Sequence, residues 1–304
     1  MSYVGPEFEP PRVPRRSVLR RPLVVALAAL VPGALAGWLA YGAVGGGSGD
    51  DDGGGRVKAP VSGTPSAHSP ATAGADGKGA APLEGRVVVI DPGHNPANVR
   101  HTAEINRPVD IGTHRKECDT TGTSTNSGYA EAAFTLDVAQ RLRTLLQAQG
   151  ATVKLTQDGD RPYGPCVDER ARIGNAAHAD AVVSIHADGS ATGNRGFHVI
   201  LPGAVHAGEA DTRPIVAPSR ALGTALADDF ARVTGSARSN YLGGGTGLVT
   251  RTDLGGLNLS TVPKVFIECG NMRDSKDAAL LTSGAWRQKA ALGMSEGIVS
   301  FLRG

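Results

Sequence analysis

Short runs rich in β-branched residues alternate with longer stretches in which apolar residues recur every three or four positions along residues 86–304. The short runs predict buried strands and the longer stretches predict amphipathic helices. The predicted strands are Val87–Asp91, Ala151–Thr156, Val182–His186, Phe197–Leu201 and Lys264–Glu268, and the predicted helices are Tyr129–Gln149, Asp168–His178, Ser219–Thr234 and Ala285–Leu302. This order predicts one α/β domain over residues 85–304, with a twisted, mostly parallel or mixed β-sheet flanked by helices.

The first 84 residues have a different character. Residues 1–21 carry five arginines against two glutamates, and residues 22–44 contain no charged residue. This pattern predicts a basic cytoplasmic or signal n-region, followed by a transmembrane anchor or the hydrophobic region of a signal peptide. Cleavage after Ala36 and export through a twin-arginine signal at Arg15 and Arg16 both remain open. Residues 45–84 are rich in Gly, Pro, Ser and Ala and predict a flexible linker.

Composition and charge limit the classes of function that the chain can have. The chain has 304 residues, 40% of them hydrophobic and 20% charged, and a net charge of +2. Residues 1–21 alone contribute +3, so the remainder sums to −1. We therefore expect no nucleic-acid partner, because no basic surface is left to bind one. We expect a monomer, with the membrane as a partner through residues 22–44 if that segment is not cleaved.

Polar residues able to bind a metal lie at the ends of three of the predicted strands: His94, His186 and Glu268. The carboxyl ends of strands in an open α/β sheet meet at one crevice, so these side chains can converge. Glu131 joins them from the first turn of a helix, although a carboxylate there also complements the helix dipole. Two histidines and a carboxylate are a typical ligand set of catalytic zinc.

Four segments carry a family resemblance: Val88–His94, Gly128–Glu131, Ser184–Asp188 and Val265–Met272. They are similar to the signatures of the zinc-dependent N-acetylmuramoyl-L-alanine amidases of bacterial cell walls. The resemblance covers essentially all of residues 86–304 and is nearest to the actinobacterial branch. It implies Zn²⁺ held by His94, Glu131 and His186, and Glu268 as the catalytic acid and base.

The same resemblance implies an exported enzyme of the extracytoplasmic cell envelope. Its substrate would be peptidoglycan or a muropeptide, and it would cut the amide bond between N-acetylmuramic acid and L-alanine. Zinc would activate the attacking water, and Glu268 would first accept and then return a proton. Two alternatives remain: a zinc hydrolase acting on another amide or muropeptide, and a zinc-dependent peptidoglycan-binding regulator without turnover.

Several residues near the predicted metal ligands have two possible roles. Asp91 and Asp188 either orient the histidines or belong to loops, and Asn271 either contacts the peptide stem or forms a turn. The remaining histidines are predicted in the linker, in loops or on the surface: His68, His101, His114, His178, His198 and His206. Residues 95–125 predict an ordered loop beside the zinc, and residues 243–247 a flexible rim.

Three cysteines are too few for a disulfide-built fold. Cys118 and Cys166 lie in predicted loops rich in Gly, Thr and Pro, where a bridge outside the cytoplasm is plausible. Cys269 would then be a free, buried thiol, although a bridge between Cys118 and Cys269 is not excluded. Cys269 stands where many relatives have leucine, and it should face away from the metal because neighbouring strand residues point to opposite sides.

Overall fold

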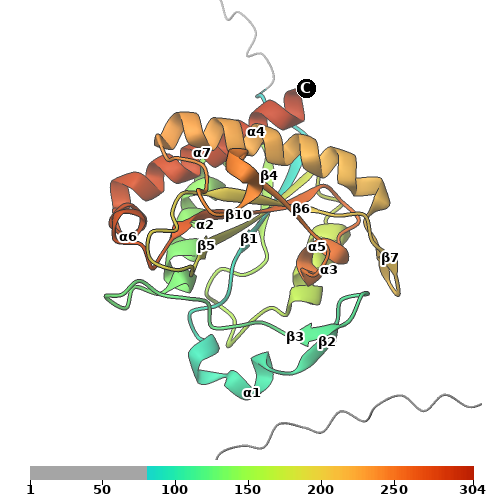
Figure 1. Ribbon diagram of the computed structural model, residues 1–304. Coiled ribbons are helices and arrows are strands. Elements are labelled where there is room, and N and C mark those ends of the chain that lie inside the picture. The colour runs from blue at the N-terminus through green and yellow to red at the C-terminus, as the bar shows by residue number, and fades with distance from the viewer. Residues whose placement is uncertain (1–80) are drawn as a thin grey trace, which may run out of the picture. The chain divides into compact units, whose positions relative to one another are not determined.

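A six-stranded sheet lies at the centre of residues 81–304, the part of the chain that the computed structural model describes (Figure 1). In spatial order its strands are β4 (Thr152–Leu155), β1 (Val87–Pro92), β5 (Ala181–Asp188), β10 (Lys264–Asn271), β6 (His198–Pro202) and β9 (Leu248–Arg251). All neighbouring pairs are parallel except β10 with β6, which is antiparallel. The predicted mixed α/β fold is therefore confirmed.

Helices cover both faces of this sheet. The larger core lies under three long helices: α2 (Glu131–Ala148), α4 (Val216–Thr234) and α7 (Gly284–Arg303). The opposite face carries α3 (Val167–Ala176) and the short α5 (Gly255–Asn258), which lie together below the sheet in Figure 1. The smaller elements are α1 (Thr102–Ile105), α6 (Ser275–Leu281) and the two-stranded pairs β2 (Pro108–Asp110) with β3 (Arg115–Glu117) and β7 (His206–Ala207) with β8 (Ala210–Asp211).

The apolar spacing explains how α2 docks. Phe134, Val138 and Leu142 recur on one face of the helix and are all fully buried against the sheet. Successive side chains four residues apart stack along one stripe, as such spacing predicts. Gly150 ends the segment in a left-handed conformation, with a φ of 91° that favours glycine.

The predicted segments 1–21 and 22–44, and nearly all of the linker 45–84, lie outside the described residues. At the start of the described part, Leu83 is fully buried in the larger core and its backbone N–H donates to the carbonyl of Gln149. The folded region thus begins before Arg86. Within residues 81–304, no helix has both the length and the apolar character needed to cross a membrane.

Two predicted irregular segments contain regular structure. Residues 95–125 hold a 3₁₀ turn, α1 and the β2–β3 pair, and residues 243–245 form a 3₁₀ turn that leads into β9. These elements are three or four residues long, too short for any periodicity to be visible in the sequence. The strand β9 was missed for the same reason, because only Leu248 and Val249 are apolar.

Candidate active site

The edge of the sheet where β1, β5 and β10 end gathers the three residues proposed as metal ligands. His94 lies two residues beyond β1, His186 lies on β5, and Glu131 is the first residue of α2. One potential ligand atom from each of the three lies within 4.8 Å of the others. Glu131 Oε1 is 3.2 Å from His94 Nε2 and 3.0 Å from His186 Nδ1. The geometry thus brings these side chains together, as the strand-end argument predicts.

Backbone contacts hold Glu131 in place. Glu131 is 4% exposed, and its carboxylate accepts hydrogen bonds from the N–H groups of Thr123 at 2.9 Å and Ala187 at 3.2 Å. Burial alone would raise the pKa of Glu131, but the neighbouring His94 and His186 lower it. A carboxylate that only complements a helix dipole would be solvated, so this reading does not fit the buried side chain.

Close packing at Gly93 brings His94 and His186 together. A Cβ atom at Gly93 would lie 2.3 Å from His186 Cε1, so only glycine fits between β1 and this imidazole. His94 follows with a φ of 61°, a left-handed conformation that few side chains adopt. Hydrogen bonds from Gln157 and Arg170 to the His94 carbonyl stabilise this turn, at 3.0 and 2.9 Å.

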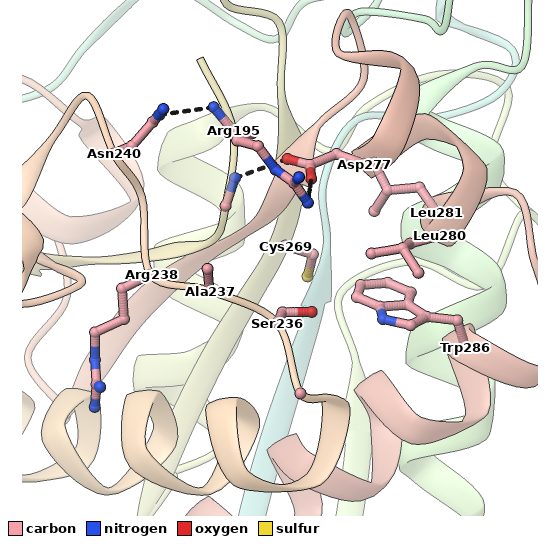
Figure 2. A pocket seen from close by; sticks show the side chains of 12 residues that line it. Arg195, Ser236, Ala237, Arg238, Asn240, Cys269, Asp277, Leu280, Leu281 and Trp286 are labelled. Carbon is pink, nitrogen blue, oxygen red and sulfur yellow. Dashed lines mark hydrogen bonds and ion pairs between the residues drawn. The ribbon is translucent and has the colours of Figure 1, made fainter. Parts of the chain in front are cut away.

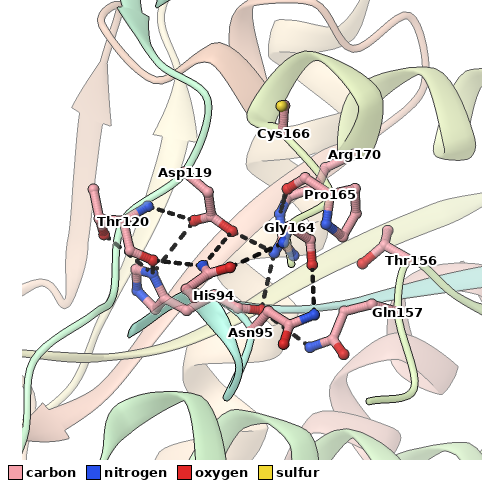
Figure 3. A network of polar contacts seen from close by, with 12 residues as sticks. His94, Asn95, Asp119, Thr120, Thr156, Gln157, Gly164, Pro165, Cys166 and Arg170 are labelled. Carbon is pink, nitrogen blue, oxygen red and sulfur yellow. Dashed lines mark hydrogen bonds and ion pairs between the residues drawn. The ribbon is translucent and has the colours of Figure 1, made fainter. Parts of the chain in front are cut away.

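A second set of contacts orients the His94 ring (Figure 3). Its Nδ1 lies 3.1 Å from the carbonyl oxygen of Thr120 and 3.5 Å from Asp119 Oδ1. Burial alone would raise the pKa of Asp119, but Arg170 and His94 beside it lower the value to about 2. Asp119 therefore stays ionised and stabilises an Nδ1–H on His94, which leaves Nε2 facing Glu131. Which nitrogen carries the proton is inferred from these partners.

Arg170 on α3 connects Asp91, Asp119 and the turn at His94 through buried contacts. Its side chain is 5% exposed and bridges two buried carboxylates, Asp91 at 2.8 Å and Asp119 at 3.0 Å. It also donates to the carbonyl oxygens of Pro165, Pro92 and His94. Asp91 in turn accepts from Lys264 at 3.0 Å, whose side chain is 1% exposed. These buried ions form one continuous network.

Glu268 lies beside His186 on the neighbouring parallel strand. Both line a cavity of about 430 Å³ together with His94 and Glu131. Burial, together with the carboxylates of Glu131 and Asp188, raises the pKa of Glu268 well above its ordinary value. Its Oε2 is buried without a hydrogen-bond partner among the described residues.

Aromatic packing fixes the other side of the site. The ring of Phe266 stacks on His186 with centroids 5.1 Å apart and planes 13° apart. Lys264 Nζ lies 5.6 Å from the centroid of the same phenyl ring. The His186 imidazole is therefore held between Phe266 and the close backbone at Gly93.

Three residues that the sequence does not mark as functional also contribute to the site. Asp119 orients His94, Arg251 lines the wall, and Tyr241 donates to Asp188 at 2.6 Å. No sequence signal marks Tyr241, because it lies in an irregular segment. Asp119 directly follows Cys118, and this position beside a bridged cysteine is the one sequence feature that could have marked it.

The contacts of Asp91 and Asn271 decide between the two roles predicted for each. Asp91 does not contact a histidine side chain, because its carboxylate bonds Thr156, Arg170, Ser184 and Lys264. Asn271 is buried and its amide bonds backbone groups of residues 190–194 and 273, which favours the turn role.

The surface prediction for His198 is wrong. This residue is 2% exposed on β6, where it pairs with Glu268 across the antiparallel ladder. Burial lowers the pKa of His198. The His198 ring packs edge-on against Tyr241, with ring centroids 5.9 Å apart, and this contact helps to cover it. His101, His114, His178 and His206 lie in loops or short surface elements, and His68 lies outside the described residues.

The cysteines pair as the first of the two alternatives proposes. Cys118 and Cys166 form a disulfide, with an S–S distance of 2.04 Å. Cys269 is free and buried, which excludes its pairing with Cys118. The bridge joins the residue before Asp119 to the residue before α3, and thereby connects the two segments that carry Asp119 and Arg170.

Comparison with known proteins agrees with the observed fold. Residues 88–300 match the family described as N-acetylmuramoyl-L-alanine amidase. The chain is 42% identical over 225 residues to the N-acetylmuramoyl-L-alanine amidase Rv3717 of Mycobacterium tuberculosis, covering 72% of this chain and 88% of that protein. The crystal structure of Ami1 from Mycobacterium smegmatis is 39% identical, with a TM-score of 0.66 over 72% of this chain and 98% of that one. The amidase AmiC2 of Nostoc punctiforme, 20% identical with a TM-score of 0.54 over 74% of this chain and all of that one, shares the fold.

Proposed function

The chain belongs to the N-acetylmuramoyl-L-alanine amidase family, and we propose that it hydrolyses the amide bond between N-acetylmuramic acid and L-alanine in peptidoglycan through a zinc-activated water. The observation that carries this proposal is the convergence of His94, Glu131 and His186 at one wall of a cavity that also holds Glu268. Three ligand groups and a separate carboxylate are the parts that a zinc hydrolase requires.

The donor chemistry of the site fits a zinc ion. Two imidazoles and one carboxylate are a common catalytic set, which leaves one coordination position for water. The electrostatics also favour a cation, because Glu131, Asp188 and Glu268 bring three carboxylates to the same cavity. Burial alone would lower the pKa of His94, but the carboxylates of Glu131 and Asp119 raise it to about 10. Bound zinc would lower the pKa of a water molecule to about 7 and polarise the substrate carbonyl.

Glu268 supplies the proton transfers. As a base it accepts a proton from the attacking water, and as an acid it then returns that proton to the leaving nitrogen of L-alanine. The buried Oε2, which has no other partner among the described residues, is the atom available for both steps. Because a single carboxylate serves in succession, no second acid is required.

The remaining residues hold these groups in position. Asp119 and Thr120 fix the His94 ring, and Phe266 supports the ring of His186. Their role is to keep the imidazoles aimed at one point, since small misplacements of reacting groups are costly.

We further propose that the enzyme works outside the cytoplasm. Residues 1–21 and 22–44 would direct export as an n-region and an anchor or cleaved signal, and residues 45–84 would tether the catalytic domain 85–304. The Cys118–Cys166 bridge supports an oxidising compartment, because disulfides are rare in the cytosol.

Incubation of the full chain with purified muropeptides tests the proposed activity. Mass spectrometry should detect released stem peptides with a free L-alanine amine, and a chelator should abolish their release. Glu268→Gln should lose turnover while retaining substrate binding and metal. Glu296→Gln, a change on the outer helix α7, serves as the matched control and should keep full activity. Muropeptide binding without new amine ends in the unaltered protein would instead support the non-catalytic regulator.

A further inference from the structure

A second cavity, of about 340 Å³, lies beside Cys269 of β10 (Figure 2). Cys269 lines this cavity whereas Glu268 lines the active-site cavity, because consecutive strand residues point to opposite faces. The two cavities share no lining residue. Its walls come from the loops around Arg195 and Ser236, the end of α6 and the start of α7.

Unpaired hydrogen-bonding atoms are concentrated around this cavity. Among residues 81–304, eight buried side-chain N or O atoms have no hydrogen-bond partner, and four of them belong to its lining residues. They are Arg195 Nε, Ser236 Oγ, Arg238 Nε and Trp286 Nε1. Such groups are costly to leave unpaired in a folded protein, so their gathering at one cavity points to a missing partner.

Trp286 shows most clearly that an unpaired donor points into the cavity. Its side chain is 6% exposed and packs between Phe134 and Phe230, with ring centroids 6.5 and 6.1 Å away. These contacts hold the indole in one orientation. Figure 2 shows the nitrogen edge of the ring turned toward Ser236 and Cys269, on the far side of the cavity. Figure 2 also shows Arg238 turned down toward α4, so the inference does not depend on it.

The unpaired groups of the cavity are mostly hydrogen-bond donors, which favours a ligand that accepts hydrogen bonds. Indole and guanidinium nitrogens donate but cannot accept hydrogen bonds. The one buried carboxylate nearby, Asp277, is already used: Oδ1 pairs with Arg195 at 3.1 Å, and Oδ2 accepts from the N–H groups of Gly196 and Asn271. Among the unpaired side-chain atoms of the lining residues, only the Ser236 hydroxyl can accept, whereas Trp286 Nε1 and Arg195 Nε can only donate.

We propose that this cavity is a ligand site for a small apolar carboxylate. The carboxylate oxygens would accept from Trp286, Arg195 and Ser236, and the apolar part would lie against Leu280 and Leu281. A charged acceptor satisfies several donors at once and makes stronger hydrogen bonds than a neutral one. A cationic ligand would leave all of these donors unpaired.

Sodium octanoate is the probe, and its neutral analogue octanamide is the control. The full chain is titrated with each compound, and binding is followed by tryptophan fluorescence and by saturation-transfer NMR of the ligand. We expect saturable binding of octanoate and about tenfold weaker binding of octanamide, the loss expected when a charge-assisted hydrogen bond becomes neutral. Neither readout depends on turnover, so the result stands apart from the proposed amidase activity.

Two variants locate the site. The chain has two tryptophans, Trp38 and Trp286, so Trp286→Phe should abolish the fluorescence change and also weaken binding seen by NMR. Ser236→Ala is the gentler change, since this residue lies in a loop, and it should weaken octanoate binding by about threefold to tenfold with unchanged circular dichroism. Absence of saturable octanoate binding, equal binding of octanamide, or unaltered binding in both variants would overturn the proposal.

Discussion

Replacing Arg170 with methionine should destabilise the protein strongly, although this residue lies outside the reacting groups. Methionine keeps the apolar stem but removes the cation between Asp91 and Asp119, which lie 2.8 and 3.0 Å from it. All three side chains are nearly fully buried. The carboxylates would lose their shared partner, and the carbonyl oxygens of Pro165 and His94 would lose a donor.

Breaking a buried ion pair by removing one partner costs about 3–5 kcal/mol, and the orphaned carbonyls add to it. Lys264 still pairs with Asp91, which limits the loss on that side. We therefore expect the free energy of unfolding to fall by about 4 kcal/mol. At about 2–4 °C per kcal/mol for a domain of this size, the melting temperature should fall by about 10 °C.

Chemical denaturation of the full chain, followed by circular dichroism, measures this loss. The matched control is Arg161→Met, because Arg161 forms a two-point ion pair with Glu169 at a half-exposed position. Exposed pairs contribute about 0–1 kcal/mol, so the control should remain within 1 kcal/mol of the unaltered protein. Equal and small losses in both variants would refute the reasoning that the buried network stabilises this region.

Three further predictions follow from the same region. The pKa of Asp119 is lowered to about 2 in the folded protein, so its contribution to stability is present above the unfolded pKa near 3.8 and is lost as the pH falls toward 2. Asp119→Asn should therefore flatten the dependence of the unfolding free energy on pH in that window. An unchanged slope would contradict this. Serine at both Cys118 and Cys166 should lower the free energy of unfolding by about 4 kcal/mol, from the loop of 48 residues that the bridge closes, and a loss below about 1 kcal/mol in denaturant would argue against it. Gly93→Ala places a Cβ 2.3 Å from His186, so turnover on muropeptides should fall by about 100-fold while the fold persists; normal turnover would show that the imidazole can move freely.

The sheet and the strand-end residues were predictable because burial leaves a clear pattern. The strands β1, β5 and β10 are covered on both faces and read as continuous apolar runs, each followed by a polar residue. Rules for open α/β sheets then bring His94, His186 and Glu268 to one edge. The spacing of Phe134, Val138 and Leu142 similarly predicted α2.

The residues that orient the site were not predictable in the same way. Asp119 lies 51 residues from Arg170 in the sequence, and the two meet because the Cys118–Cys166 bridge and the turn at His94 bring their segments together. Their roles depend on three-dimensional contacts rather than on a local pattern. His198 was misplaced for a related reason, since its ring packs against Tyr241, which lies in an irregular segment that no sequence pattern marks.

Metal content tests the central claim most directly. Zinc bound per chain is measured by inductively coupled plasma mass spectrometry for the unaltered protein, for alanine variants of His94, Glu131 and His186, and for His206→Ala, whose imidazole is exposed on β7. We predict about one zinc ion per chain in the unaltered protein and the control, and a large loss in each of the three variants, because a three-ligand site does not tolerate removal of a ligand. Full zinc content in the three variants would contradict the account.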